Sequence, residues 1–186
     1  MNPSADDIAK ACDKVLAKDV FVLPNNKNII LAAEQAKALS KRKLHIIPSH
    51  NIPQGLSAVL AFNPEDTVSN NESNMIDAMQ YVRAGMVTYA VRSTQVDNFD
   101  LKEGDIIGID SKSIVAKGEN VNKVTTELVD RMMDDEVTNI TLYFGNNVSE
   151  EEAASIAEDL AAKYKKCDVD IHFGGQPLYY YIVSLE

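Results

Sequence analysis

Apolar residues recur at helical and strand spacings through the first half of the chain. Ile8, Ala11, Cys12 and Val15 predict a helix from an N-cap at Ser4, with Asp7 in its first turn, to about Ala17. The apolar run at 20–23, closed by Pro24, predicts a strand buried on both faces, and 44–47 predicts a second strand that stops at Pro48. Helices are expected over 29–39 and from Pro53, in a first turn that tolerates proline. This alternation predicts a parallel sheet with right-handed crossovers.

The pattern changes in the second half. The polar segment 63–73 predicts a loop, and the helix that follows it is expected to end at Gly85 as a C-cap. Further helices are expected over 121–133 and after a capping box formed by Ser149 and Glu152. Strands are expected over 87–92, 105–110, 113–117, 140–144, 168–173 and 179–185. The sequence therefore predicts an α/β fold of two lobes, residues 1–85 with a parallel βαβ sheet and residues 86–186 with a mixed-sheet α+β layer.

Composition narrows the functional classes. The 186 residues hold 18 Lys and Arg against 28 Asp and Glu, a net charge of −10. This sign argues against nucleic-acid binding and against docking on anionic lipid surfaces. No apolar run approaches the roughly 20 residues that span a bilayer, and no signal peptide is evident. Two cysteines are too few for a disulfide framework or a zinc cluster. A soluble, cytoplasmic protein without a membrane span or nucleic-acid partner is expected.

Catalytic signatures are missing from the sequence. The eight glycines form no phosphate-binding loop, and no nucleophile elbow or paired metal ligands occur. We therefore expect no catalytic residue, metal ligand or cofactor in these 186 residues. A stand-alone enzyme that uses His50 or His172 is the weakest hypothesis, because no carboxylate close in sequence would orient His50.

Polar turns follow the first two predicted strands. The first turn contains Asn25, Asn26, Lys27 and Asn28, and the second contains Ser49, His50 and Gln54. Ligands of open α/β sheets collect where loops leave the carboxyl ends of strands, and helix N-termini there favour anions. The alternative is that these Asn-rich turns only cap helices and reverse the chain.

Four sequence stretches resemble one family. They are 22–30 (Val-Leu-Pro-Asn-Asn-Lys-Asn-Ile-Ile) followed by 32–36 (Ala-Ala-Glu-Gln-Ala), 52–55 (Ile-Pro-Gln-Gly) with 61–64 (Ala-Phe-Asn-Pro), 87–92 (Val-Thr-Tyr-Ala-Val-Arg) and 172–179 (His-Phe-Gly-Gly-Gln-Pro-Leu-Tyr). Together they resemble the C-terminal domain of the fatty acid kinase catalytic subunit, of the dihydroxyacetone-kinase-like family. The resemblance covers nearly the whole chain in the same order.

The resemblance implies a DegV/EDD-like fold and a place in a larger kinase. In that family an N-terminal domain uses ATP and Mg²⁺ to phosphorylate a fatty acid held by a separate acyl-binding DegV-family protein. The C-terminal domain is not catalytic and docks this partner; the alternative is that it binds a fatty acid or another carboxylate itself. The start Met1-Asn2-Pro3-Ser4 resembles an internal family stretch, so the first parallel strand is expected to be missing.

The ligand or partner is expected at the two polar turns and at three stretches that carry the resemblance. Where acyl-binding DegV proteins have Ser/Thr-rich loops that bind the fatty acid carboxylate, this chain has Asn and Lys; the change counts against fatty acid binding by this domain, although Asn and Lys are also able to hold a carboxylate. The expected binding residues are Asn25, Asn26, Lys27, Asn28, Ser49, His50, Gln54, Gly55, Arg92, Gly174, Gly175 and Gln176.

Overall fold

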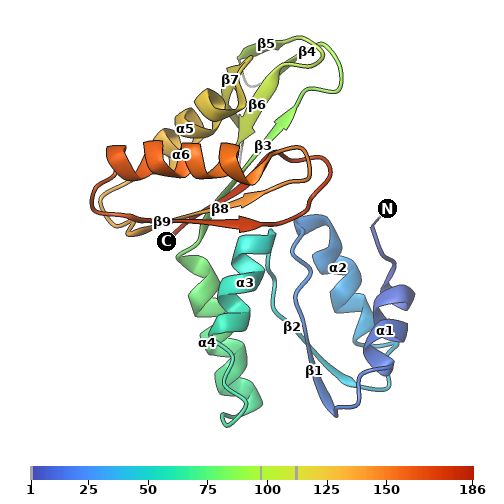
Figure 1. Ribbon diagram of the computed structural model, residues 1–186. Coiled ribbons are helices and arrows are strands. Elements are labelled where there is room, and N and C mark those ends of the chain that lie inside the picture. Colours follow the sequence, from blue (N-terminus) through green and yellow to red (C-terminus); the bar gives the residue numbers. More distant parts are fainter. Residues whose placement is uncertain (1, 97, 112) are drawn as a thin grey trace. The chain divides into compact units, whose positions relative to one another are not determined.

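The computed structural model describes residues 2–96, 98–111 and 113–186, so Met1 of the expected internal stretch lies outside them. The chain divides into two compact units, unit 1 up to Val82 and unit 2 from Arg83 to Glu186 (Figure 1). The division falls three residues before the boundary expected at residue 85, because the first strand of unit 2 begins at Arg83.

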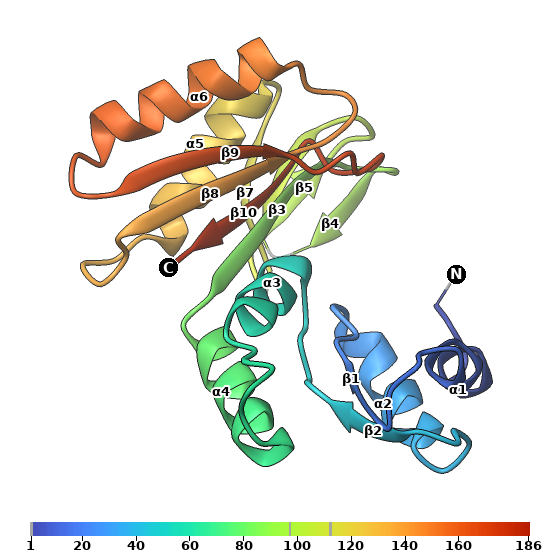
Figure 2. The same cartoon turned by 60° about the horizontal axis from the view of Figure 1, so that its bottom comes forward.

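Unit 1 has three layers around a parallel pair of strands. Strand β1 (Asp19–Val22) pairs with β2 (Lys43–Ile46), with Val20 opposite Leu44. Alternate side chains of the strands point to opposite faces. One face packs with helices α1 (Ala5–Asp13) and α2 (Lys27–Ala36), and the other with α3 (Ile52–Leu60) and α4 (Val68–Gln80) (Figure 2).

Three boundaries in unit 1 differ from the sequence predictions. Helix α1 ends at Asp13 and not near Ala17. The Asp13 carboxylate accepts hydrogen bonds from Ser40 Oγ (2.7 Å) and from the Lys41 backbone N–H (2.8 Å), so the chain turns toward β1 at this point. The loop expected over 63–73 is wrong in its second half, because α4 begins at Val68. The buried Asn71 side chain donates to the Asn63 carbonyl oxygen (2.8 Å), which explains how such a polar segment packs as a helix.

The expected C-cap at Gly85 is also wrong. Helix α4 ends at Gln80, and Gly85 lies inside strand β3 (Arg83–Tyr89). A Cβ at this position would lie 2.7 Å from Met132 Sδ and 3.0 Å from a Leu128 methyl carbon, so the glycine serves close packing against α5 and not a helix end.

Unit 2 is a mixed six-stranded sheet with two helices on one face. The strands run in the order β7 (Ile114–Gly118), β6 (Ile106–Ile109), β3, β10 (Tyr181–Leu185), β8 (Asn139–Phe144) and β9 (Asp168–Phe173). Among the described strands of this sheet only β8 and β9 pair in parallel, and α6 (Glu150–Lys163) connects them. Helix α5 (Val121–Met132) lies beside α6 on the same face (Figures 1 and 2). The expected α/β fold with a mixed sheet is confirmed.

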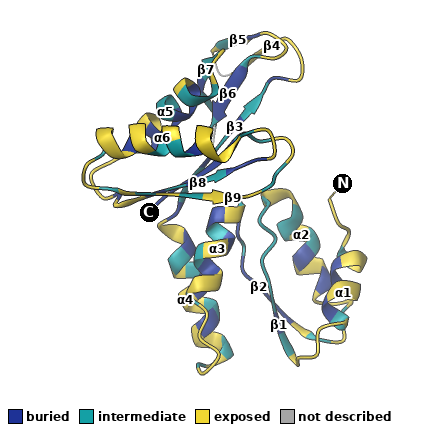
Figure 3. Cartoon of the chain, viewed as in Figure 1, coloured by how far each residue is buried: buried dark blue, intermediate teal, exposed yellow. Residues whose placement is uncertain are grey.

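The core of unit 2 lies between these helices and the sheet. Leu128 of α5 and Ile156 of α6 are fully buried against Leu142 and Val183, whereas the outward side of α6 is exposed (Figure 3). A small hairpin of β4 (Thr94–Val96) and β5 (Phe99–Leu101) was not predicted, because each strand has only three residues.

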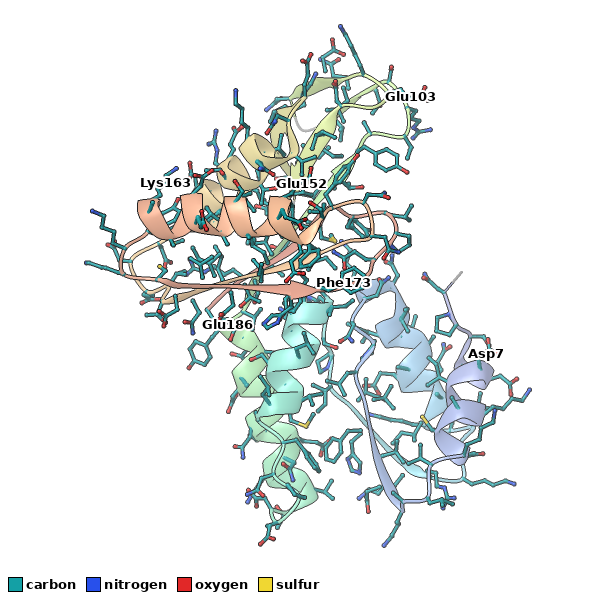
Figure 4. All side chains as sticks on the ribbon, viewed as in Figure 1. Asp7, Glu103, Glu152, Lys163, Phe173 and Glu186 are labelled. Carbon is teal, nitrogen blue, oxygen red and sulfur yellow. The ribbon has the colours of Figure 1, made fainter. Side chains whose placement is uncertain are left out.

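Both expected helix starts are confirmed. The side chains of Ser4 and Ser149 each accept a hydrogen bond from the backbone N–H three residues later. In turn, the carboxylates of Asp7 and Glu152 accept from the backbone N–H of Ser4 and Ser149. These two acidic side chains are labelled at the first turns of α1 and α6 in Figure 4.

Candidate functional site

The two polar turns of unit 1 meet at one edge of the parallel pair. Both strands end there, and Ile47 N–H extends the pairing to the Val22 carbonyl oxygen (2.9 Å). The Ser49 hydroxyl is fully buried, donates to Asn25 Oδ1 (2.7 Å) and accepts from the Asn25 backbone N–H (3.0 Å). Asn25 has a φ of 53°, the left-handed conformation that Asn tolerates better than most residues. Two hydrogen bonds between Asn25 and Ser49 therefore hold the two turns together.

Gly55 allows helix α3 to pack closely against the hydrogen-bonded Asn25 and Ser49. A Cβ built on Gly55 would lie only 2.0 Å from Asn25 Oδ1, a separation that real Cβ atoms essentially never show. Because Gly55 is buried and has no side chain, the Asn25 amide lies directly against the first turns of α3. The residues Asn25, Ser49 and Gly55 thus form one packed junction, which we call the turn junction.

Several other polar residues at this edge cap helices. Asn26 Oδ1 accepts from Asn28 N–H (2.9 Å) at the start of α2. Gln54 Oε1 accepts from His50 N–H (2.8 Å), and Asn51 caps α3. The alternative from the sequence, that Asn-rich turns cap helices, is confirmed for Asn26. In the described part of the chain no hydrogen bond or ion pair engages the side chains of Lys27 or His50, and both are exposed.

The candidate residues of unit 2 serve mainly to hold one turn. Gly174 N–H donates to the Phe144 carbonyl oxygen (2.9 Å), and Gln176 Nε2 donates to the Tyr143 carbonyl oxygen (2.7 Å). Gly175 has a φ of 67°, which glycine adopts without strain. Beside this turn the ring of Phe173 is 67% exposed at the end of β9 (Figure 4).

Arg92 does not join that turn. It is exposed three residues beyond β3, and no hydrogen bond or ion pair links it to the turn within the described ranges. Since β10 and β8 lie between β3 and β9, the two candidate parts of unit 2 stand at separate positions along one end of the sheet.

The three histidines have different environments. His45 is buried, with Nε2 2.9 Å from Asp19 Oδ1 and Nδ1 3.2 Å from Glu72 Oε1. The hydrogen bond from His45 holds the pKa of the Asp19 carboxyl below its usual value. His50 and His172 are exposed. No cluster of three or more His, Cys, Asp or Glu able to hold a metal occurs among the described residues.

Sequence reasoning missed an apolar stripe on α3. The helix buries its small residues Pro53, Gly55 and Ala58, and it exposes large aliphatic side chains on the other side. The exposed set is Ile52 (47%), Leu56 (41%), Val59 (53%) and Leu60 (86%), which we call the α3 stripe. The signal was present, since these residues follow the helical spacing i, i+4, i+7, i+8. It was overlooked because large apolar residues at helical spacing are ordinarily assigned to the core.

Solved structures of DegV-family proteins and of a dihydroxyacetone kinase share the fold of this chain. Three structural relatives have the same fold at low sequence identity. The Streptococcus pneumoniae fatty acid kinase (Fak) B3 protein, loaded with linoleic acid, matches with a TM-score of 0.67 and 14% identity, over 99% of this chain and 76% of that one. DegV of Bacillus subtilis, a fatty acid binding protein, matches with a TM-score of 0.60 and 19% identity over 98% and 77% of the two chains. The dihydroxyacetone kinase of C. freundii matches with a TM-score of 0.63 and 15% identity over 98% and 41%.

The sequence comparison identifies the family. The model of the FakA-like C-terminal family of fatty acid kinases matches residues 1–186, and the chain belongs to this family. Protein YloV of Bacillus subtilis is 44% identical over 186 residues, which are the whole of this chain and 34% of that protein. A Staphylococcus aureus (strain MRSA252) protein is 33% identical over the same shares. The chain thus spans about a third of the curated relatives that it matches, and no helix in the described residues is long and apolar enough to cross a bilayer.

Proposed function

We propose that this chain is the non-catalytic C-terminal domain of a fatty acid kinase and that it docks an acyl-binding DegV-family protein. ATP and Mg²⁺ chemistry is assigned to another part of the longer protein, since the chain covers 34% of its curated relatives and has no phosphate-binding loop of its own. In this proposal the docked partner presents the fatty acid to that other part.

The α3 stripe is the observation that supports docking most directly. Four large aliphatic side chains on one helix face are solvent-exposed, while the same helix buries a proline, a glycine and an alanine. Contiguous exposed apolar surface on a protein marks interaction sites. Helix α3 starts at the turn junction, so the exposed Lys27 and His50 lie at the same edge of unit 1 and supply polar contacts around the stripe.

The turn junction favours docking over the alternative of fatty acid binding. The polar groups nearest to the expected carboxylate position, the Ser49 hydroxyl and the Asn25 oxygen, are already bonded to each other. The Asn25 side chain also occupies the space beside Gly55. A carboxylate at this point would have to displace Asn25, whereas a protein surface would contact the exposed side chains without such a change.

A binding measurement with purified DegV-family acyl carrier of the same organism tests the proposal. Leu60→Asp places a charge in the stripe at a position that is 86% exposed, so folding is unaffected, and we expect binding to weaken at least tenfold. The matched control is Leu16→Asp, because Leu16 is 97% exposed and lies in the loop before β1, outside the α3 stripe. Lys27→Ala and Asn26→Ala test the polar residues at the start of α2. For Lys27→Ala we expect a smaller loss of binding than for Leu60→Asp.

Two outcomes contradict the proposal. One is absence of binding by the unaltered chain at micromolar concentration. The other is an equal loss for Leu60→Asp and Leu16→Asp, which would remove the stripe from the interface. Native mass spectrometry of the freshly purified chain tests the alternative, and a co-purified fatty acid that is lost in Asn25→Ala would support it.

A further inference from the structure

Two loops at the amino ends of β1 and β2 form a basic surface on unit 1. The loops span 14–18 and 37–42, and we call them, together with Lys43 at the start of β2, the amino-end surface. Leu16 at the tip of the first loop is 97% exposed, and Val15 (43%) and Leu39 (57%) are exposed beside it. Such apolar exposure in a loop rich in lysine is unusual for a surface that faces only water.

The two loops line an open pocket whose walls are mostly cationic. Its volume is about 500 Å³ and its walls are formed by Leu16, Ala17, Lys18, Lys41, Arg42 and Lys43. Four of these six residues are cationic and none is acidic.

The neighbouring carboxylates are turned mainly to other partners. Asp13 accepts from Ser40 and from the Lys41 backbone, and Asp19 is bonded to His45, with Lys43 Nζ farther away at 4.0 Å. The Arg42 guanidinium reaches only a backbone oxygen, with Nη2 3.4 Å from the Asp13 carbonyl, and its buried Nε has no acceptor in the described part of the chain. Asp13 lies near Lys41, and Asp19 lies near Lys43 and Lys18, so these two carboxylates offset part of the charge. Four cations against two carboxylates still leave the pocket net positive toward an outside anion.

The net charge of −10 does not describe this surface. Unit 1 contains eight Lys and Arg against nine Asp and Glu, whereas unit 2 contains ten against 19. The acidic excess thus belongs almost entirely to unit 2. At physiological salt, charges act over about 8 Å, so the local cations decide what approaches the amino-end surface.

We propose that the amino-end surface docks on anionic phospholipid membranes. Leu16 enters the boundary between headgroups and acyl chains, and the surrounding Lys18, Lys41, Arg42 and Lys43 contact lipid phosphates. A phospholipid surface offers hydrocarbon and phosphate side by side, which matches an exposed aliphatic tip beside a positive pocket. A free phosphate would use the cations and leave Leu16 without a role. The proposal is independent of the partner docking proposed above.

Vesicle co-sedimentation of the full chain tests this inference. We expect binding to vesicles of phosphatidylcholine with 30% phosphatidylglycerol, no binding to pure phosphatidylcholine, and loss of binding at high salt. Lys18→Gln and Lys41→Gln should each weaken binding about fivefold, as one surface cation contributes roughly a kilocalorie. Leu16→Ser should weaken it about tenfold, because part of a leucine side chain no longer leaves water.

Matched controls come from other elements of unit 1, helix α3 and the first turn of α2. Leu60→Ser removes a leucine that is 86% exposed, and Lys27→Gln removes an exposed cation; neither should change vesicle binding. The inference is overturned by equal binding to both vesicle types, by absence of binding at low salt, or by a Leu60→Ser effect as large as that of Leu16→Ser. Soluble glycerol phosphate that shifts the Leu16 and Lys41 amide NMR signals, without vesicle binding, would likewise overturn it in favour of a free phosphate.

Discussion

Substitution of Gly55 by alanine tests the turn junction. In an ordinary exposed helix, Gly→Ala stabilises by about 0.8–1 kcal/mol. At Gly55 the new Cβ would stand 2.0 Å from Asn25 Oδ1, so that oxygen must move by about 1 Å or more. Its hydrogen bond from Ser49, 2.7 Å long, is then lost.

Whether Gly55→Ala raises or lowers the free energy of unfolding depends on the cost of leaving the Ser49 hydroxyl without its acceptor. Ser49 is fully buried, and a buried hydroxyl that loses its acceptor costs roughly 1–3 kcal/mol. This exceeds the helix gain, so we expect Gly55→Ala to destabilise unit 1 by about 1 kcal/mol. In an Asn25→Gly background the obstacle is absent, and the same substitution should then stabilise the unit by about 1 kcal/mol.

Amide hydrogen exchange followed by mass spectrometry provides the assay, because peptides from β2 and α3 report unit 1 separately from unit 2. The four proteins of the double-mutant cycle are compared at one pH and temperature. The reasoning fails if Gly55→Ala stabilises α3 in the unaltered chain, or if its effect is the same in both backgrounds.

Three further predictions concern single side chains. Tyr181→Phe should stabilise unit 2 by about 1 kcal/mol in urea unfolding, because its buried hydroxyl lacks a partner among the described residues and burial raises the pKa of Tyr181 to about 12. Ser149→Ala should lower the stability of unit 2 by about 1 kcal/mol, measured in the same way, since the capping box of α6 is lost. Asp19→Asn should destabilise unit 1 at pH 7, and its effect should shrink as the pH falls below the unfolded carboxyl pKa. The pKa of Asp19 is lowered by His45, so its contribution is complete above the unfolded carboxyl pKa near 4 and disappears as the pH falls through the lowered folded value.

Each of these predictions has a contrary result. Tyr164→Phe is the control for Tyr181, because the Tyr164 hydroxyl donates to Asp130 and its loss should destabilise; the same sign for both would refute the reasoning. An unchanged unfolding midpoint for Ser149→Ala would show that the cap is replaced by water. A constant difference between Asp19→Asn and the unaltered chain from pH 7 to pH 2 would mean that the carboxylate contact is not electrostatic. Circular dichroism is suited to these measurements, since the chain has no tryptophan.

Local signals predicted the fold well where a few neighbouring residues decide the structure. The capping boxes at Ser4 and Ser149 need only residues three positions apart, and both are present. Gly85 was misassigned because glycine ends helices and also permits close packing in strands, and only the position of Met132, 47 residues away in the chain, distinguishes the two. Helix α4 was predicted to start too late because the buried Asn71 side chain is satisfied by the carbonyl of Asn63, a contact across the preceding turn that the polar sequence pattern does not indicate.

The site was predictable in outline only. Parallel strands bring their following turns to one edge, so the proximity of Asn25 and Ser49 follows from the strand pattern. The contact of Asn25 with Gly55 does not follow from any local pattern, because it depends on how α3 crosses the edge. The α3 stripe shows the same difficulty: Leu56 and Leu60 repeat at helical spacing, and periodicity alone does not say which side of a helix faces water.

The position of β10 also determines how unit 2 is assembled during synthesis. Residues 181–185 lie between β3 and β8, so the ribosome has delivered nearly all of unit 2 before the strand that joins its two halves exists. Until then β3 with its hairpin neighbours, and β8 with β9, each present an unpaired edge to solvent or to a chaperone. Removal of these five residues would leave two half-sheets with nothing between them, and a nascent chain stalled before Tyr181 should be a target for proteolysis.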